Sequence, residues 1–335
     1  MHKAPFYALT LMTALAASGT FASAQSYDNQ IKLAGISGLV SHDGIPDGFD
    51  AVNASAEQLE AYGFPMRPDP SDAKAYERWV KAVSLTRVKG EYINTGRFHR
   101  PVQKIKETKD ATSNISKLES GNWSGYAITG GSPAFVQVEG LWIVPTVANT
   151  KSGENGYMSE WVGIDGDCSC NDLIQDGTEQ QFTGGKASYY AWVEFIPEDE
   201  VEISSFPVAP GDVIEAYSSM TEKSGVVYGN YYMANYNTGK AVSTSLKIPP
   251  NTKFSGLSAE WIVERTEVNG SFSNPLPFYA YTYMDNAFAW RNGSSTAISY
   301  LSKANQNIEM YQGNTALSKA YSQDSDSLWF EWLAY

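Results

Sequence analysis

The sequence has no histidine after residue 118. The chain has 335 residues and three histidines, and His2, His42 and His99 all lie upstream of that point. A Ser-His-Asp or Cys-His triad and a histidine-based zinc site are therefore excluded from residues 119–335. Carboxylates, amides, hydroxyls and aromatic rings remain as the groups available for catalysis there.

Cysteine is nearly absent as well. Cys168 and Cys170 are the only two, so a disulfide scaffold is excluded, and a metal site built on them would need further ligands. A disulfide across a single residue is strained, although an exported protein can still oxidise the pair. No glycine-rich loop has the context of a phosphate-binding motif. We expect neither a metal nor a cofactor.

Basic residues are few and unevenly distributed. The chain has 24 Lys and Arg against 37 Asp and Glu, which argues against a nucleic-acid partner because little would neutralise phosphates. Residues 25–118 are close to neutral, with 13 basic and 12 acidic residues, whereas residues 119–335 hold 10 basic and 25 acidic residues. The chain thus divides into two unlike parts.

No hydrophobic run after the N-terminus approaches the length of a membrane span. Residues 6–17 are apolar, follow a basic start, and precede the small residues Ala22, Ser23 and Ala24. This pattern is typical of a secretory signal peptide, with a buried N-terminal helix as the alternative. We expect a signal peptide at 1–24 and a secreted monomer without membrane contact.

Residues 25–118 combine one helical stretch with one strongly basic stretch, and we expect this part to be loosely organised. In residues 73–83, Tyr76, Trp79, Val80 and Val83 recur at helical spacing, behind a cap at Ser71 or Asp72. Residues 87–109 hold seven Lys and Arg against two Glu. We interpret 25–118 as a prosegment whose basic stretch lies on the acidic part, with a solvated linker as the alternative for 87–109.

Residues 119–335 are typical of an all-β protein. Stretches rich in β-branched and aromatic residues alternate with turn residues. These stretches lie at 135–144, 157–165, 187–196, 212–220, 226–236, 257–266, 279–284, 296–302 and 327–335. The pattern predicts an antiparallel β-sandwich or barrel, and the length favours one large sandwich of two packed sheets.

Three of these stretches place carboxylates beside aromatic side chains. Side chains alternate along a strand, so each of three sets shares one face: Glu260, Ile262 and Glu264; Tyr190, Trp192 and Glu194; Trp161, Gly163 and Asp165. Carboxylates are costly in a closed core. One such Glu is usually solvated, but the repeated pattern favours a wet cleft on the concave side of a sheet.

Five motifs in this part resemble one known family. NWSGY (122–126), EWVGIDGD (160–167), LIQ (173–175), YAWVE (190–194) and AEWIVE (259–264) follow one another in this order. Their combination resembles the glutamic peptidases, or eqolisins, which are secreted acid endopeptidases. The resemblance covers about residues 120–335. It implies a concanavalin-like sandwich with a substrate groove across one sheet.

The resemblance also implies a metal-free catalytic pair of one Gln and one Glu. Residue by residue, this pair falls on Gln175 and on Glu264 rather than Glu260. Glu264 would activate a water, and the Gln175 amide would stabilise the oxyanion. The implied substrate-binding positions are Trp123, Trp161, Asp165, Trp192 and Glu194, with Glu179 standing where fungal members have Asp.

The resulting hypothesis is an acid endopeptidase that acts on polypeptides and is made as a precursor. The domains would be a signal peptide at 1–24, a prosegment at 25–118 and a peptidase domain at 119–335. The prosegment would act as an intramolecular inhibitor, with a Lys or Arg near Glu264 or Glu194. A secreted β-sandwich glycoside hydrolase and a non-catalytic lectin-like module are the alternatives.

Overall fold

The computed structural model describes residues 36–335, except 43, 110–113, 131, 151–152, 169, 269, 273 and 300–302. The expected signal peptide at 1–24 lies outside the described residues. Among the residues described, no helix has both the length and the apolar character needed to span a membrane.

Twenty strands and two helices follow one another along the described chain. The part upstream of residue 119 contains β1 (Leu39–Ser41), α1 (Ala56–Ala61), α2 (Ala73–Val83), β2 (Thr86–Arg87), β3 (Tyr92–Asn94), β4 (Lys104–Lys109) and the start of β5 (Ser116–Ser120). The next strands are β6 (Trp123–Thr129), β7 (Phe135–Ile143), β8 (Gly156–Ile164), β9 (Leu173–Thr183), β10 (Lys186–Ile196), β11 (Val201–Ile203), β12 (Val213–Lys223) and β13 (Val226–Asn235). The chain continues through β14 (Lys240–Lys247), β15 (Ser258–Glu264), β16 (Tyr281–Arg291), β17 (Ile298–Ser299), β18 (Gln306–Gln312), β19 (Thr315–Ser322) and β20 (Leu328–Trp332).

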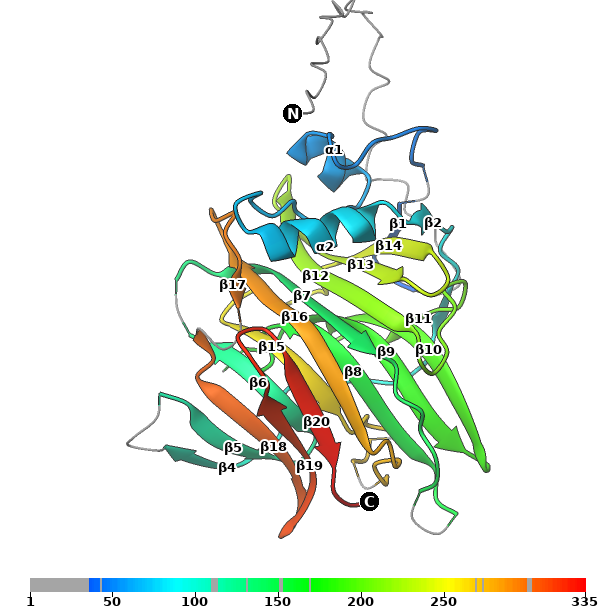
Figure 1. The fold of residues 1–335 in the computed structure, drawn as a ribbon, viewed down its shortest axis with the longest axis vertical. Helices are drawn as coiled ribbons and strands as arrows, with labels where there is room; N and C mark the ends of the chain where they lie inside the picture. The colour runs from blue at the N-terminus through cyan, green and yellow to red at the C-terminus, as the bar shows by residue number, and fades with distance from the viewer. Residues whose placement is uncertain are drawn as a thin grey trace, which may run out of the picture.

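The strands form two packed sheets, as the sequence predicts (Figure 1). The front sheet runs in the order β11, β10, β9, β8, β15, β6, β18, and the back sheet in the order β14, β13, β12, β7, β16. Strands β19 and β20 connect β18 to β16, so the hydrogen-bonded ladder continues from one sheet to the other. The pairing within both sheets is antiparallel. Only the short additions β2 on β14 and β5 on β18 are parallel.

A hydrophobic core fills the space between the sheets. Large side chains from both sides are fully buried there, including Trp142 of β7, Trp261 of β15 and Phe195 of β10. The Trp261 indole N–H donates to the backbone carbonyl of Glu139 at 2.8 Å, which satisfies its one polar group. This core supports the front sheet from behind and leaves that sheet's outer face free to carry polar groups.

The sequence analysis missed β9 although it lies in the middle of the front sheet. Its inward-facing side chains are polar: Asp176 accepts from Ser218 at 2.7 Å, and Thr178 accepts from the Trp142 indole N–H at 2.9 Å. Gln175 and Glu179 alternate with them, so no hydrophobic side chain marks either face between Ile174 and Phe182. Hydrophobic periodicity cannot detect such a strand.

Residues 36–118 are well organised, and the expectation of a loose segment was wrong. The predicted helix is present as α2, with Ala75, Trp79, Ala82 and Val83 buried. It follows Asp72, whose carboxylate makes no bond to α2 and instead accepts from the backbone of Ala297 at 3.2 Å. The segment packs on both outer faces of the sandwich.

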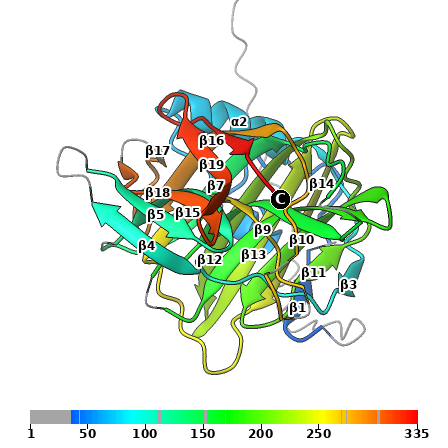
Figure 2. The same ribbon diagram turned by 90° about the horizontal axis from the view of Figure 1, so that it is seen from below.

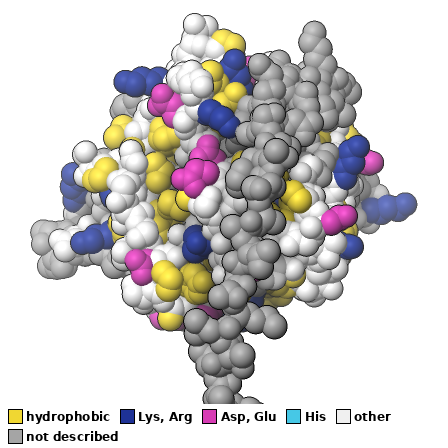
Figure 3. All heavy atoms as spheres, turned by 90° about the horizontal axis from the view of Figure 1, so that it is seen from above, with side chains coloured by type: hydrophobic (Ala, Val, Ile, Leu, Met, Phe, Trp, Pro, Cys, Tyr) yellow, Lys and Arg dark blue, Asp and Glu magenta, His cyan; other side chains and the backbone are white. Residues whose placement is uncertain are grey.

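Two regions of this segment have different positions. Residues 36–94, here called the back cover, place α2 beside β12, β13 and β14, with α1 packed on α2 (Figure 1), and add strands to the sheet edges. On this side of the molecule, hydrophobic, acidic and basic side chains are interspersed (Figure 3). Residues 97–102, here called the strap, lie on the outer face of the front sheet. Beyond the strap, β4 pairs with β5, and β5 extends the sheet beside β18 (Figure 2).

Candidate functional site

The candidate residues lie on neighbouring strands of the front sheet. Glu264 of β15 is opposite Ser159 of β8, which is opposite Glu179 of β9. Two rows further along the same face, Gln175 of β9 is opposite Glu194 of β10. Because side chains alternate, these groups share the outer face of the sheet. The register therefore agrees with the predicted carboxylate-lined face.

The Glu264 carboxylate is fully buried and held by neutral donors. The Trp161 indole N–H donates to Oε2 at 3.0 Å, and the Asn122 side-chain amide donates to Oε1 at 3.2 Å. Asn122 is fixed in turn because its Oδ1 accepts from Ser120 and from the backbone of Gln103. These contacts hold the carboxylate in one orientation without adding positive charge.

Gln175 is linked to Glu264 through two intermediate residues, Glu194 and His99. Its side-chain nitrogen donates to Glu194 Oε2, and the other oxygen of Glu194 accepts from the backbone N–H of His99 at 3.2 Å. Gln175 Oε1 is buried and has no hydrogen-bond partner among the described residues. Burial raises the pKa of Glu194 well above its usual value, which favours a neutral carboxyl group beside the amide.

The side chain that contacts Glu264 is the imidazole of His99, where the sequence analysis expected Lys or Arg. His99 Nδ1 is 3.0 Å from Glu264 Oε2, and Nε2 is 2.7 Å from Glu200 Oε2. The ring stacks on Trp192 with centroids 4.0 Å apart. The flat imidazole lies on Trp192 and directs one ring nitrogen to Glu264 and the other to Glu200. The flexible side chains of Lys and Arg do not hold two donors on opposite sides of one small ring.

His99 carries a positive charge in this environment. Burial alone would lower its pKa, but the carboxylate of Glu264 and the hydrogen bond to Glu200 raise the pKa of His99 well above its usual value. Burial likewise opposes ionisation of Glu200, yet the bond from His99 brings the pKa of Glu200 below its usual value. The buried imidazolium and the carboxylates around it therefore stabilise one another.

Basic residues on both sides of His99 pair with acidic residues of the sandwich. Arg97 is 3.3 Å from Glu179, Arg100 is 2.6 Å from Glu267, and Lys104 is 2.6 Å from Asp167. Burial and the nearby Glu200 raise the pKa of Glu179 to about 8, although Arg97 and His99 oppose that rise. The prediction that the basic stretch lies on the acidic part agrees with these contacts.

The backbone of the strap also approaches Glu264. The N–H of Arg100 lies 3.5 Å from Glu264 Oε1, and the Asn122 amide approaches the carbonyl oxygen of Arg100 at 3.3 Å. Phe98 and Val102 pack on a small hydrophobic cluster of the front sheet that includes Trp123 and Trp161. The strap therefore covers the outer face of the front sheet over Glu264.

The remaining predicted site residues fall into two groups. Trp123 and Trp192 are fully buried beside the strap, and neither indole nitrogen has a hydrogen-bond partner among the described residues. Trp123 meets Trp161 edge to face, with ring centroids 4.9 Å apart. Asp165 lies elsewhere: its carboxylate accepts from the backbone N–H groups of Gly256 and Leu257, both at 2.6 Å.

Asp165 is thus tied to a loop of the sandwich, and its hydrogen bonds go to that loop and not to the strap. Burial and the nearby Asp172 raise its pKa to about 7. Glu260, two rows from Glu264 on the same strand, is also fully buried, and burial and Asp165 raise its pKa well above the usual value. Neither side chain is among the partners of His99, Gln175 or Glu264.

The sequence analysis did not single out three residues that the structure brings to the site. His99 is the one histidine within the basic stretch 87–109, Asn122 precedes the tryptophan of NWSGY, and Glu200 lies in the acidic run that follows β10. The isolated histidine among basic residues was the available signal for His99. Nothing in the local sequence pairs Glu200 with residue 99.

Two groups of residues lie close enough together to suggest a metal site within the described parts of the chain. They are Asp165 with Cys168 and Cys170, and His99 with Glu179 and Glu200. Cys168 and Cys170 are joined in a disulfide, so they offer no thiolate, and Asp165 already binds two backbone amides. In the second group, His99 and Arg97 already supply positive charge to the two carboxylates.

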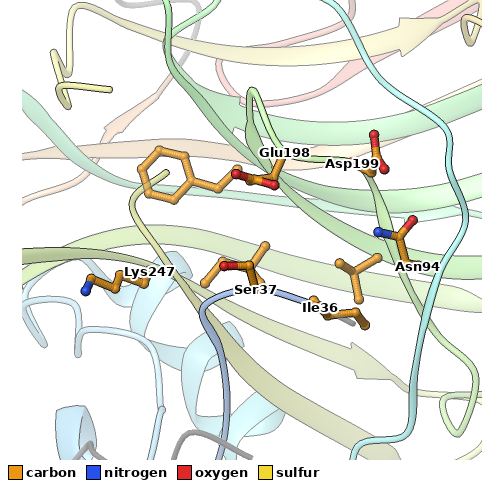
Figure 4. Close-up of a pocket in the computed structure, with 9 residues that line it drawn as sticks. Ile36, Ser37, Asn94, Glu198, Asp199 and Lys247 are labelled. Carbon is orange, nitrogen blue, oxygen red and sulfur yellow. The ribbon is translucent and has the colours of Figure 1, made fainter. Parts of the chain in front are cut away.

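A small pocket elsewhere in the molecule contains none of the candidate residues. It is lined by Ile36, Ser37, Asn94, Phe195, Glu198, Asp199, Val201, Leu246 and Lys247 (Figure 4). The pocket lies where the start of the back cover meets the turn between β10 and β11. The candidate site is not hollow in this structure because the strap fills it.

Comparison with known proteins agrees with this geometry. Residues 121–332 match the model of the Peptidase A4 family. Aspergillopepsin-2 of Aspergillus niger is 29% identical over 207 residues, which are 57% of this chain and 71% of that protein. Scytalidopepsin B of Scytalidium lignicola is 29% identical over 164 residues, 48% of this chain and 59% of that protein.

Solved structures match the sandwich as a whole. A scytalido-glutamic peptidase in complex with a transition state analogue inhibitor superposes with a TM-score of 0.54 and 24% identity, and the match covers 64% of this chain and 98% of that chain. These likenesses show an all-β sandwich fold. Together with the family match over most of residues 119–335, they show that this chain is a member of the Peptidase A4 family, the glutamic peptidases.

Proposed function

We propose that the protein is a secreted acid endopeptidase in which Glu264 activates a water molecule and Gln175 stabilises the tetrahedral oxyanion. The observation that carries this proposal is a buried carboxylate, oriented by Trp161 and Asn122, on the same sheet face as a buried side-chain amide two strands away. Family membership supports the reaction class. The alternatives of a glycoside hydrolase or a lectin-like module have no such support.

The chemistry follows from the two groups. Ionised Glu264 takes a proton from water as the water attacks the scissile carbonyl carbon, and protonated Glu264 then delivers that proton to the leaving amine. The Gln175 amide donates to the developing oxyanion, a contribution of about 3–4 kcal/mol for such donors. Its other hydrogen-bond partner, Glu194, is favoured in its neutral form by burial, so acid pH leaves this arrangement intact.

Residues 25–118 would act as a prosegment that inhibits the enzyme in the precursor. His99 Nδ1 contacts Oε2 of Glu264, and the backbone N–H of Arg100 approaches Oε1. The strap would thereby exclude a substrate from the front sheet. Acid protonates Glu200, which holds His99, so the attraction on the strap weakens while Arg97 and Arg100 stay charged. The enzyme would therefore be latent at neutral pH and would lose the strap in acid.

The boundary of the mature domain is best placed before β5. This strand pairs with β18, and Leu118 is fully buried in the cluster that contains Trp123. A cut at 118 would divide β5, whereas a cut between Lys109 and Ser116 would leave it whole. We therefore move the expected processing site upstream by a few residues and keep the signal peptide at 1–24, with a secreted, monomeric, cofactor-free product.

The test is hydrolysis of casein and of a fluorogenic peptide from about pH 2 to 7. Glu264→Gln and Gln175→Ala should each lower kcat by at least about 100-fold, since each removes a group that acts in the transition state. Glu260→Gln is the matched control, because it makes the same chemical change on the same strand away from His99. Equal losses from both Glu variants, in folded protein, would contradict the assignment.

A further inference from the structure

The back cover and the strap belong to one stretch of chain but are bound in different ways. The strap is held mainly by charged groups around His99, Arg97 and Arg100. The back cover is held mainly by backbone pairing, by buried apolar side chains and by neutral hydrogen bonds, and Lys74 adds ion pairs with Asp285 and Asp326. This difference decides which part leaves when the charged contacts are lost.

Backbone hydrogen bonds join three strands of the back cover to the free edges of two sandwich strands, β14 and β11. β1 pairs with β14, where Leu39, Val40 and Ser41 face Leu246, Ser245 and Thr244. β2 adds in parallel to the other end of β14, and β3 pairs with β11 at the edge of the front sheet. These bonds do not titrate, and they protect edges that would otherwise be open.

Apolar side chains close the interface between α2 and the back sheet. Ala82 lies in a cluster with Tyr217, Tyr232, Ala234 and Ala241, and Ala75 lies in another with Phe288 and Trp290. All are at most 7% exposed, and Trp290 is fully buried. Without the back cover, these aromatic rings would form a contiguous exposed patch, which soluble monomers rarely tolerate.

Most polar contacts at this interface are between neutral groups, and the exceptions are the ion pairs of Lys74 of α2 with Asp285 and Asp326. The Tyr232 hydroxyl donates to the carbonyl of Ala82 at 3.0 Å, and the Gln137 side chain bonds both backbone groups of Met66. The Ser243 hydroxyl donates to the carbonyl of Gly63 at 2.5 Å. A Cβ at Gly63 would lie 2.3 Å from that hydroxyl, and its φ is +67°, so the close approach requires glycine.

Acid pH does not loosen the groups beneath α2. Glu139 is fully buried, and neither carboxylate oxygen has a partner among the described residues. Burial raises the pKa of Glu139 and of its neighbour Glu215, so both are favoured as neutral carboxyls. The other titratable groups that face the pair are Arg78 and Asp72 of the back cover, Tyr217, Tyr236 and Asp326. Protonation therefore makes burial of Glu139 less costly.

Taken together, these contacts lead to one inference. We infer that the back cover is not discarded with the strap: residues 36–94 stay bound to the sandwich as a second, non-covalent chain after the precursor is cut. The description of this assembly as the active enzyme rests on the proposed function, but the binding itself does not. The occupant of the back face is thus a segment of this same protein.

The experiment uses the full-length precursor with two inserted recognition sequences for a site-specific protease. One follows Gly96, and the other follows Gln103, so that cleavage frees the strap from β3 on one side and from β4 on the other. The cut protein is passed over a size-exclusion column near pH 4, and intact masses are measured across the peaks. We expect the N-terminal fragment to co-elute with the sandwich and the strap peptide to elute separately.

A matched pair of substitutions tests whether the α2 interface carries the binding. Ala82→Asp places a charge among Tyr217 and Tyr232 and should release at least half of the N-terminal fragment after cutting. Ala73→Asp makes the same change at an exposed position of the same helix and should release none.

Recovery of the wild-type N-terminal fragment apart from the sandwich would overturn the inference, whether the sandwich then stays folded or aggregates. If Ala82→Asp prevents folding of the precursor, the wild-type masses still decide. Peptide hydrolysis by the same column peak is measured separately, so failure of the proposed function and failure of the retained cover give different results.

Discussion

The strap and the back cover show how one segment can bind to a protein in two ways. The strap places a buried imidazole and basic side chains among carboxylates, whereas the back cover places a helix and three strand additions against an apolar face. Coulombic contacts respond to pH and salt, but burial and backbone pairing respond little. One region is suited to leave when conditions change, and the other is suited to remain.

The largest effect that separates the two regions is expected at their histidines. His99→Ala in the precursor should raise peptide hydrolysis by about 100-fold, because it removes two charge-assisted hydrogen bonds of roughly 1.5–3 kcal/mol each. The assay is run at the most neutral pH where mature enzyme turns over. His42→Ala is the control: His42 belongs to the back cover and bonds Ser245 at 2.8 Å, so its loss should not raise activity. Equal activation by both variants would remove the distinction.

A synthetic strap peptide sharpens the same comparison. Because docking raises the pKa of His99, this residue favours docking of the strap at every pH below its pKa in the free peptide. That contribution to binding is lost only as pH rises through the pKa of docked His99. Because docking lowers the pKa of Glu200, this residue favours docking at every pH above its pKa without the strap. That contribution to binding is lost as pH falls through the lowered pKa. Docking is therefore strongest between these two limits.

Inhibition of mature enzyme by a peptide of residues 95–109 should be about tenfold weaker near pH 3.5 than near pH 6, since one pKa unit corresponds to about 1.4 kcal/mol. Added salt should weaken it in the same direction. A peptide with His99→Gln keeps the size and polarity of the side chain and should inhibit weakly at both pH values. Identical inhibition constants for the unmodified peptide at the two pH values would exclude the electrostatic explanation.

A moderate effect is expected on the stability of the sandwich itself. Burial raises the pKa of Glu179 to about 8 and of Asp165 to about 7. A raised carboxyl pKa stabilises the fold in full below the unfolded value near 4, and this contribution is lost as pH rises through the folded pKa. Melting temperatures should thus fall between pH 4 and 7.5, and Asp165→Asn should reduce the fall. A steady rise over that range would contradict this reasoning.

The smallest effect is expected from metal removal. Among the described residues, the two candidate ligand groups are engaged with backbone amides, a disulfide or basic side chains. Dialysis against EDTA should leave both kcat and the melting temperature of the mature enzyme unchanged. Loss of activity that returns on adding a divalent cation would show that one of these groups binds a metal after the strap has left.

The sequence could predict the parts of the site that depend on local periodicity of side chains. Alternation of Trp and Glu along β10 and β15 placed Glu194 and Glu264 on one face, and helical spacing predicted α2 around Trp79. The choice of Glu264 over Glu260 came from the family resemblance, and it remains a prediction. Alternation alone cannot distinguish two residues that share a face.

What the sequence could not predict depends on contacts between distant residues. His99 meets Glu264 across 165 positions and Glu200 across 101 positions, and no local period records such a meeting. β9 escaped detection because its buried face uses Asp176 and Thr178, which find polar partners in the core. The back cover was taken as loose because its binding surface lies on strands far downstream.

The strap is anchored at both of its ends, by β3 of the back cover on one side and by β4 and β5 on the other. Its effective concentration at the cleft is therefore set by the geometry of the chain, in the millimolar range typical of short tethers, and not by the amount of protein. Dilution cannot activate such a precursor. A single cut between β4 and β5 leaves the strap on one tether, if the back cover stays bound. Activation would then follow a time lag, until a second cut releases the strap into solution as a free peptide.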